Sequence, residues 1–284
     1  MITSANPRIP AHLQAKRDLS EGLAVFRFEL AREFHFQPGQ YATLWLTHNG
    51  KTTPRPYSIA SSPSETRALE FYINLVEHGR LTPSLWEEGV LEGLHRRSPG
   101  THMEITGPKG RFLLAPVERR DLVFVASGTG LAPFMSMIRK LNEDYLAARE
   151  AFLRRHILVI HGASYSSNLG YREELEALAF ETMRDPHRKL SVTYLPTISR
   201  PHLDPSWSGL KGRAETLFEC PSDRNLDCAD PQFMVRSMLH SLLRPETHVV
   251  YACGHPGTID NVERFLSPRG FKQDLDLKRE KFYN

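Results

Sequence analysis

Cysteine is scarce in this 284-residue chain, which contains only Cys220, Cys228 and Cys253 and has no Cys-x-x-Cys pair. An odd number of cysteines at these spacings argues against a disulfide framework. Three cysteines are also too few for a zinc ion or an iron–sulfur cluster that is held by four thiolates. We therefore predict no metal site.

Long apolar runs are also lacking. No segment approaches about 18 consecutive apolar residues, the length that a membrane-spanning helix needs. The opening "MITSANPRIP" has no basic flank followed by an apolar stretch. We expect neither a membrane span nor a signal peptide, and a cytoplasmic protein is the default.

Excess charge is small, with a formal net charge of +3 and an isoelectric point near 8.7. This balance is too mild to indicate nucleic acid as a partner, and we expect none. Basic pairs nevertheless recur along the chain. One interpretation is an ordinary solvated surface. The other is that together they bind an acidic protein partner, because complementary charge speeds encounter. The pairs are Lys16-Arg17, Arg96-Arg97, Arg119-Arg120, Arg154-Arg155 and Lys278-Arg279.

The first part of the chain consists of short β-rich runs that are separated by Pro/Gly turns such as "QPGQ", "SPG" and "GPKG". This punctuation is typical of a β-sandwich or barrel. One exception is "TPSLWEEGV", where Thr82 and Pro83 predict the cap and first residue of a short helix. The predicted strands cover residues 22–30, 40–46, 69–76 and 102–106.

After residue 116 the pattern changes to strand–helix–strand. Continuous apolar runs such as "DLVFVAS" and "HILVIHG" are typical of buried parallel strands. Helices are predicted from the periodicity of 134–145, from "YREELEALAF", and from Asp230 and Pro231, which would cap and open "QFMVRSMLHSLL". The pattern predicts a doubly wound α/β domain over residues 116–284, preceded by a β domain over 1–115. We interpret the polar segment 203–229 as a loop or insertion.

In an open parallel sheet, ligands bind beyond the carboxyl ends of the strands. The first strand ends in "SGTGLAP", where Gly128 and Gly130 allow close approach of an anion to a helix N-terminus, although such a turn can also be purely structural. The last predicted strand ends in "ACGHPG", so Cys253 is expected at the same sheet edge. We interpret His255 as a surface turn residue.

Three cations follow the third strand of this domain. Arg200 lies in "ISR", and Lys211 and Arg213 lie in "GLKGR". They would suit a phosphate, since arginine offers a forked set of donors, or they are ordinary surface charge.

The stretch "RPYSIASSP", Arg55 to Pro63, places a cation, an aromatic ring and four hydroxyls close together. It is either a polar strand end and turn, or a grip for a ligand that has a flat ring and a phosphate.

Several motifs occur in one order: "RPYS", "GRLTPSL", "GPKGRF", "SGTGLAP", "ISR", "CGHPG" and the tail "EKFYN". That order resembles the ferredoxin–NADP reductase family, particularly its bacterial flavodoxin/ferredoxin reductase branch, over roughly residues 10–284. The resemblance implies an FAD-binding antiparallel β-barrel followed by an NADP-binding α/β domain.

The resemblance implies that the RPYS strand holds the flavin. Arg55 would pair with the FAD pyrophosphate, Tyr57 would pack against the isoalloxazine, and Ser58 would lie near flavin N5, with Pro56 in the same contacting strand. An aromatic face, a forked cation and a small hydroxyl suit a flavin phosphate. Strand alternation, however, puts Arg55 and Tyr57 on one face and Ser58 on the other.

The second flavin element would be "GRLTPSL". Gly79 would allow a tight turn. Leu81 and Thr82 would offer backbone N–H groups to the pyrophosphate, Thr82 would add its hydroxyl, and the helix that begins at Pro83 would face that phosphate with its N-terminus.

In the second domain, the resemblance implies that Gly128, Thr129 and Gly130 contact the nicotinamide nucleotide and that Cys253 and Gly254 lie near the nicotinamide ring. The phosphate of NADP would be held by Arg200, Lys211 and Arg213. Related reductases often carry an arginine where this chain has Ser164.

The tail of the chain resembles family endings in which a terminal aromatic ring covers the flavin. Phe282 or Tyr283 would be that ring, and Glu280 would orient the nicotinamide or relay a proton. A frayed terminus is the alternative.

The expected activity is hydride transfer between NADPH and flavin N5, with single electrons passing to or from a ferredoxin or flavodoxin. Tyr57, Ser58, Cys253 and Glu280 would serve the reaction by placement rather than as covalent catalysts. Three alternatives stay open: the reductase component of an oxygenase system, an electron-transfer subunit of a larger dehydrogenase, and a non-enzymatic FAD-binding module.

Overall fold

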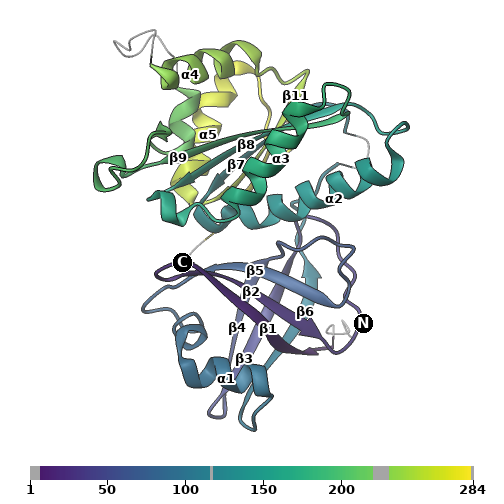
Figure 1. Cartoon of the computed structure of the whole chain (residues 1–284), viewed down its shortest axis with the longest axis vertical. Coiled ribbons are helices and arrows are strands. Elements are labelled where there is room, and N and C mark those ends of the chain that lie inside the picture. Colours follow the sequence, from purple (N-terminus) through teal and green to yellow (C-terminus); the bar gives the residue numbers. More distant parts are fainter. Residues whose placement is uncertain (1–6, 116–117, 220–229, 283–284) are drawn as a thin grey trace. The chain divides into compact units, whose positions relative to one another are not determined.

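The structure is a computed structural model, and it describes residues 7–115, 118–219 and 230–282. The fold separates into two compact units (Figure 1). One contains the chain as far as Ala115 together with Ala132–Leu141, and the other contains most of the remaining residues. Each unit is built around its own six-stranded sheet.

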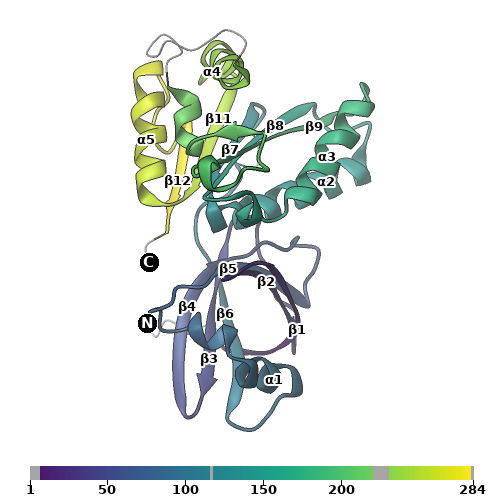
Figure 2. The ribbon, with the colours of Figure 1, turned by 60° about the vertical axis from the view of Figure 1, so that its left-hand side comes forward.

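The first unit is an antiparallel barrel, as predicted. Its strands occur in the order β4-β3-β6-β1-β2-β5. The two edge strands meet at the bridge between Ile59 and Phe71, where the Ala60 N–H also donates to the Glu70 carbonyl at 2.8 Å. This contact curls the sheet closed (Figure 2), which satisfies backbone groups that an open edge would expose. The strands are β1 Ile9–Ser20, β2 Leu23–Leu30, β3 Tyr41–His48, β4 Lys51–Ser58, β5 Ala68–Asn74 and β6 Thr101–Lys109.

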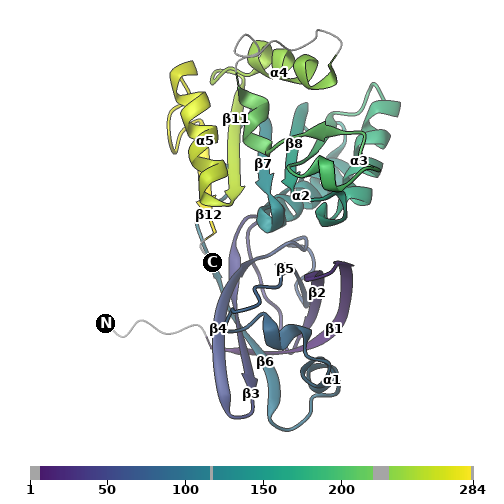
Figure 3. The same ribbon diagram turned by 90° about the vertical axis from the view of Figure 1, so that its left-hand side faces the viewer.

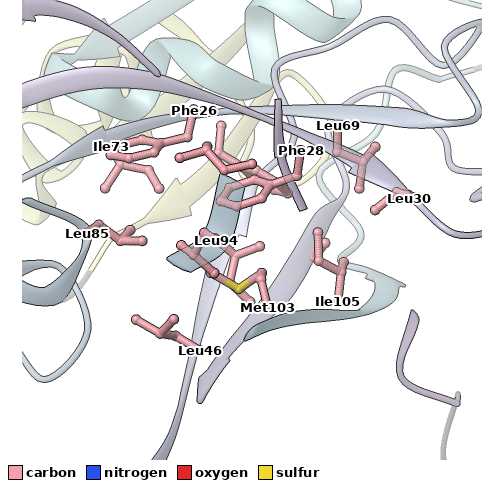
Figure 4. Close-up of a cluster of buried hydrophobic side chains, with 14 of the residues drawn as sticks. Phe26, Phe28, Leu30, Leu46, Leu69, Ile73, Leu85, Leu94, Met103 and Ile105 are labelled. Carbon is pink, nitrogen blue, oxygen red and sulfur yellow. The ribbon is translucent and has the colours of Figure 1, made fainter. Parts of the chain in front are cut away.

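The barrel core follows from alternation along these strands. In β3, Ala42, Leu44 and Leu46 are buried while Thr43 and Trp45 between them are partly exposed. Figure 4 shows how side chains from separate strands meet inside, among them Phe26 and Phe28 of β2, Leu69 of β5 and Met103 of β6. Burying one such side chain stabilises the fold by about 1.5–3 kcal/mol.

The prediction of a short helix over "TPSLWEEGV", capped by Thr82, is wrong in detail. A single 3₁₀ turn, η1 Pro83–Trp86, is followed by a separate helix, α1 Glu88–Arg96. Thr82 does not cap either of them, because its hydroxyl accepts the Val76 N–H at 3.0 Å and donates to the Val76 carbonyl at 3.1 Å. The polar group that suggested a cap closes the preceding loop instead.

The second unit is a parallel sheet, as predicted, in the order β10-β9-β8-β7-β11-β12. The chain starts at the centre with β7, moves outward to β10, and then returns to the other side with β11. The change of direction between β7 and β11 is the point at which such sheets bind ligands. The strands are β7 Asp121–Ser127, β8 Arg155–Ala163, β9 Leu190–Ile198, β10 Leu210–Lys211, β11 His248–Gly254 and β12 Leu277–Lys281.

Helices cover both faces of this sheet. Figure 3 shows α3 and α5 on opposite sides of it, which makes the unit doubly wound. No helix of the described residues is long and apolar enough to cross a membrane. The α-helices are α2 Ala132–Ala148, α3 Arg172–Arg184, α4 Pro231–Leu242 and α5 Pro256–Leu266.

The interpretation of 203–229 as a loop is wrong for its middle part. Residues Leu210–Lys211 add the edge strand β10, and the 3₁₀ turn η5, Ala214–Phe218, is buried in the core beside α4 and α5. The apolar residues in "AETLF" are too few and too close together to show a period, so the sequence did not reveal this contact. Cys220 and Cys228 lie outside the described residues.

Candidate functional site

Two glycines follow β7 and have different structural roles. Gly128 adopts the left-handed φ of +54°, and a Cβ placed there would meet no atom within 4 Å. Gly130 is tightly packed, because its Cβ would lie 2.2 Å from the carbonyl oxygen of Cys253. Gly128 therefore leaves an open backbone surface, whereas Gly130 allows the turn η2, Gly128–Leu131, to rest directly on the end of β11.

The ends of β7 and β11 lie side by side, as predicted. Cys253 pairs in register with Ala126, and the His255 N–H donates to the Ser127 hydroxyl oxygen at 2.7 Å. Gly254 has φ +124°, and its Cβ would lie 2.4 Å from that same hydroxyl oxygen. The junction is thus built from backbone and one serine.

His255 is exposed, as expected of a surface turn residue, but it also has a structural role that the sequence did not reveal. Its Nδ1 accepts the Gly257 N–H at 3.1 Å and so caps the N-terminus of α5.

Cys253 is fully buried at the end of β11. Burial raises the pKa of its thiol well above the ordinary value, and the neighbouring Glu280 carboxylate raises it further. The thiol lies 3.9 Å from Glu280 Oε2, toward which it can donate. A protonated, buried thiol is a poor nucleophile. Cys253 can therefore position a neighbour but is not suited to covalent catalysis.

The tail of the chain is anchored rather than frayed as far as Phe282. β12 pairs with β11 so that Glu280 lies opposite Cys253, and the Phe282 N–H donates to the Gly254 carbonyl at 2.8 Å. Ion pairs with Glu263 and Asp260 of α5 hold Arg279 and Lys281. Tyr283 lies outside the described residues.

The predicted phosphate-binding cations lie around the ends of β9 and β10. Lys211 pairs in register with Ile198, the last residue of β9, and Arg200 follows two residues later. Neither Arg200 nor Lys211 nor Arg213 forms an ion pair with another described residue. An anion could therefore bind there without first displacing a carboxylate.

Arg200 also has a neighbour that the sequence reasoning missed. Its guanidinium donates to the Tyr165 hydroxyl at 3.0 Å, and its N–H donates to the Ser164 carbonyl at 3.1 Å. Ser164, the position at which related reductases often carry an arginine, is therefore adjacent to Arg200. The nearby Asp204 carboxylate accepts from the Ser166 N–H and the Ser206 hydroxyl.

A second missed residue is His161 in β8, which is fully buried. Its Nε2 lies 3.2 Å from the Gly128 carbonyl oxygen, and its Nδ1 lies 3.2 Å from the Tyr194 hydroxyl. The sequence carried one signal for it, since "HILVIHG" places a titratable residue within an otherwise buried strand.

In the barrel, the register confirms the alternation that was predicted for the RPYS strand. Arg55 pairs with Leu44 and Tyr57 with Ala42, both core positions, whereas Ser58 pairs with Tyr41 on the other face. Burial raises the pKa of Tyr57 to about 12, and the Arg55 guanidinium offsets part of that effect.

Arg55 and Tyr57 are nevertheless only half-buried. The guanidinium of Arg55 donates to the Pro54 carbonyl and pairs with no carboxylate of the described residues. Pro56 is exposed and Ser58 is buried. A ring with an accessible part and a cation without an acidic partner fit a flavin nucleotide.

The second predicted flavin element is a compact loop. Gly79 is required for close approach, because its Cβ would lie 2.9 Å from both the Val76 carbonyl oxygen and the Thr82 hydroxyl oxygen. The side chains of Leu81 and Thr82 are buried. Because Val76 engages the Thr82 hydroxyl, the loop would offer a phosphate backbone N–H groups rather than that hydroxyl. The four-residue η1 provides no long helix to face the phosphate.

Two family patterns match the chain. The oxidoreductase FAD-binding domain matches residues 10–113, and the oxidoreductase NAD-binding domain matches residues 124–264. Their order agrees with that of the barrel and the parallel sheet.

Curated relatives include two kinds of reductase. The chain is 35% identical to ferredoxin–NADP reductase B of Sorangium cellulosum over 71% of this chain and 73% of that protein. It is 29% identical to the reductase component of phenol 2-monooxygenase from Pseudomonas sp. strain CF600, over 92% of this chain but only 62% of that longer protein.

Solved structures show the same fold. A ferredoxin NADP⁺ reductase from Neisseria gonorrhoeae has a TM-score of 0.72 at 19% identity, with 99% of this chain and 100% of that chain covered. A cytochrome P450 reductase from Amycolatopsis has a TM-score of 0.71 at 21% identity, with 97% and 70% covered. Together with the two family patterns and the Sorangium relative, the fold identifies this chain as an FAD- and NAD(P)-binding oxidoreductase that belongs to the ferredoxin–NADP reductase family.

Proposed function

We propose that the protein is a ferredoxin or flavodoxin–NADP⁺ reductase, with an FAD-binding domain over residues 1–115 and an NADP-binding domain over 116–284. The observation that carries this proposal is the junction of β7 and β11. There an open glycine turn, a buried thiol and the Glu280 carboxylate converge at the edge where parallel sheets bind nucleotides. A non-enzymatic flavin module would have no need of this second site.

The barrel residues bind the flavin nucleotide. The guanidinium of Arg55, which pairs with no carboxylate of the described residues, neutralises the pyrophosphate, and the accessible part of the Tyr57 ring supports the isoalloxazine. Ser58 contributes a hydroxyl from the opposite face, and Pro56 adds an apolar contact. The loop at Gly79, Leu81 and Thr82 adds backbone donors to the phosphates.

The parallel sheet binds the nicotinamide nucleotide. The Gly128–Gly130 turn receives the pyrophosphate, because its open side lets backbone approach an anion closely. Arg200, Lys211 and Arg213 contact the 2′-phosphate that distinguishes NADPH from NADH. Tyr165 holds the Arg200 guanidinium in place through its hydroxyl.

Cys253 and Glu280 orient the nicotinamide ring. The bound flavin supplies the electron chemistry, since it accepts a hydride and can release electrons singly. Because burial keeps the Cys253 thiol protonated, the group behind the ring is small and uncharged. Gly254 packs directly against Ser127 beside it, and Phe282, tethered to the Gly254 carbonyl, is the candidate for the aromatic residue that shields the site.

For the electron carrier we propose an acidic ferredoxin or flavodoxin, which the recurrent basic pairs would attract. A second candidate is a terminal oxygenase system, because relatives include the phenol 2-monooxygenase reductase component and the Acinetobacter pittii phenol hydroxylase P5 protein. The two candidates differ only in the protein that receives the electrons.

The test is anaerobic stopped-flow mixing of the flavin-loaded protein with NADPH and, separately, with NADH, while flavin absorbance is followed. Fast bleaching by NADPH and slow bleaching by NADH are expected. Equal bleaching by both nucleotides would remove the NADP assignment but retain the reductase. A protein that binds no flavin, or whose flavin neither nucleotide reduces, would refute the proposal.

A matched pair of variants sharpens this test. Arg200→Ala should slow bleaching by NADPH at low nucleotide concentration and leave bleaching by NADH unchanged. Arg154→Ala removes an exposed arginine just before β8, at the amino-terminal ends of the strands and away from the proposed site, and should alter neither. The carrier is then identified by adding a purified ferredoxin, a flavodoxin or an oxygenase component to the reduced protein.

A further inference from the structure

We infer that His161 and Tyr194 are positioning residues, which together fix the direction in which the Gly128–Thr129 peptide presents its N–H to the nucleotide. This inference rests on the proposed function, because it concerns the turn that would bind the pyrophosphate. It adds two residues from neighbouring strands, neither of which would touch the nucleotide.

The bonding pattern of His161 allows only one neutral arrangement. Its Nε2 faces the Gly128 carbonyl oxygen at 3.2 Å, and a carbonyl can only accept, so Nε2 carries the proton. Nδ1 must then be the acceptor, and it receives the Tyr194 hydroxyl at 3.2 Å. A chain of bonds therefore runs from β9 through β8 to the turn that follows β7.

The imidazole also stays neutral. Full burial lowers the pKa of His161 to about 4, so the ring carries no charge near neutral pH. A neutral ring with one fixed tautomer is a suitable positioning group, because rotating it would leave buried polar atoms without partners.

The consequence for the turn follows from peptide geometry. The Gly128–Thr129 peptide is trans, and in a trans peptide the C=O and the next N–H point in opposite directions. Because His161 holds the Gly128 carbonyl inward, the Thr129 N–H is directed to the opposite side of the turn. Gly128 has φ +54° and carries no side chain, so it would otherwise be free to turn this peptide.

A purely structural buried histidine is the competing interpretation, and the same strand offers a matched control. His156 Nε2 bonds to the Thr193 hydroxyl at 2.9 Å, so it also links β8 to β9, but it lies near the start of β8, away from the turn. If both histidines only stabilise the sheet, replacing either should change stability without affecting nucleotide binding.

The experiment compares His161→Phe, His161→Gln, Tyr194→Phe and His156→Phe in the flavin-loaded protein. The dissociation constant for NADP⁺ is measured by titration calorimetry, and thermal unfolding is recorded in parallel. His161→Phe should weaken NADP⁺ binding by about 5- to 10-fold, the effect of one neutral hydrogen bond. His161→Gln should restore most of the affinity, because the Gln amide can donate to the Gly128 carbonyl. Tyr194→Phe should have a smaller effect, and His156→Phe none.

A second measurement does not depend on the variants folding. Long-range ¹H–¹⁵N spectra of the histidine-labelled wild-type protein should show His161 as the neutral Nε2–H tautomer. An Nδ1–H tautomer would overturn the inference, as would unchanged NADP⁺ affinity in both His161 variants. Wild-type protein that binds no NADP⁺ at all would instead refute the proposed function, and the inference would fall with it.

Discussion

Gly130→Ala tests whether the two glycines after β7 have separate roles. A methyl group at Gly130 would lie 2.2 Å from the Cys253 oxygen, 2.6 Å from its carbonyl carbon and 2.7 Å from the Gly254 Cα. Ordinary contact starts near 3.4 Å, so the closest pair is about 1.2 Å too short. All three atoms belong to backbone, and no side-chain rotation can relieve the contact.

The ends of β7 and β11 must therefore separate, and overpacking of this kind costs about 1–3 kcal/mol. We expect the upper end of that range, because both elements are held in a sheet. A loss of about 3 kcal/mol would lower the melting temperature by roughly 6–12 °C in a protein of this size. Thermal unfolding followed by circular dichroism measures the change.

Gly128→Ala and Gly50→Ala are the matched controls. Both glycines have a left-handed φ, +54° and +74°, and both have open space around the position of a Cβ. Each substitution should cost only about 1 kcal/mol, the strain of a left-handed residue that carries a Cβ. Gly128→Ala should in addition weaken NADP⁺ binding, because its methyl group enters the open side of the turn. The reasoning is refuted if Gly130→Ala melts like the wild type, or if Gly128→Ala is the less stable of the two.

Three further predictions concern other parts of the molecule. Arg200→Ala should raise the Michaelis constant for NADPH by about 10-fold or more and leave that for NADH unchanged, as measured by steady-state kinetics with both nucleotides. The bidentate bond from Arg120 lowers the pKa of Glu118 from 4.5 to about 2. This pair therefore stabilises the fold fully above pH 4.5 and progressively less as the pH falls toward 2. The unfolding free energies of Glu118→Gln and wild type, measured with urea, should converge at the acid end of this range. Cys253 should resist iodoacetamide at pH 8 in the native protein and react only after unfolding, as read by peptide mass spectrometry.

Much of the fold could be predicted because its strands carry strong local patterns. The run "DLVFVAS" is buried on both faces, and its predicted bounds are those of β7. The strand β1 was missed for the opposite reason. Its sequence "IPAHLQAKRDLS" places charged and polar residues on the exposed face and only a few apolar ones, such as Leu13, on the buried face. Its place between β6 and β2 is decided by pairing, which no local pattern shows.

The edge strands of the parallel sheet show the same limit. β12 has the sequence "LKREK", in which only Leu277 is buried, and it resembles a polar tail. It becomes a strand because β11 offers a free edge and because Glu263 and Asp260 of α5 lie within reach of Arg279 and Lys281. Glu263 precedes Arg279 by 16 residues and Asp260 precedes Lys281 by 21, so the charge complementarity appears only after folding.

The residues of the candidate nucleotide site could be predicted from the sequence, but the structural role of each residue could not. The sequence marks Gly128 and Gly130 equally, yet one is open and the other is pressed against Cys253, because only the fold decides which backbone lies opposite each. His161 gives the clearest case. A histidine inside an apolar strand must find partners, since an unpaired buried imidazole would cost free energy. The sequence therefore shows that partners are needed, but they come from a different turn and a different strand. The structure identifies those partners as Gly128 and Tyr194. Because Gly128 belongs to the proposed nucleotide site, replacing His161 is expected to change nucleotide binding as well as stability.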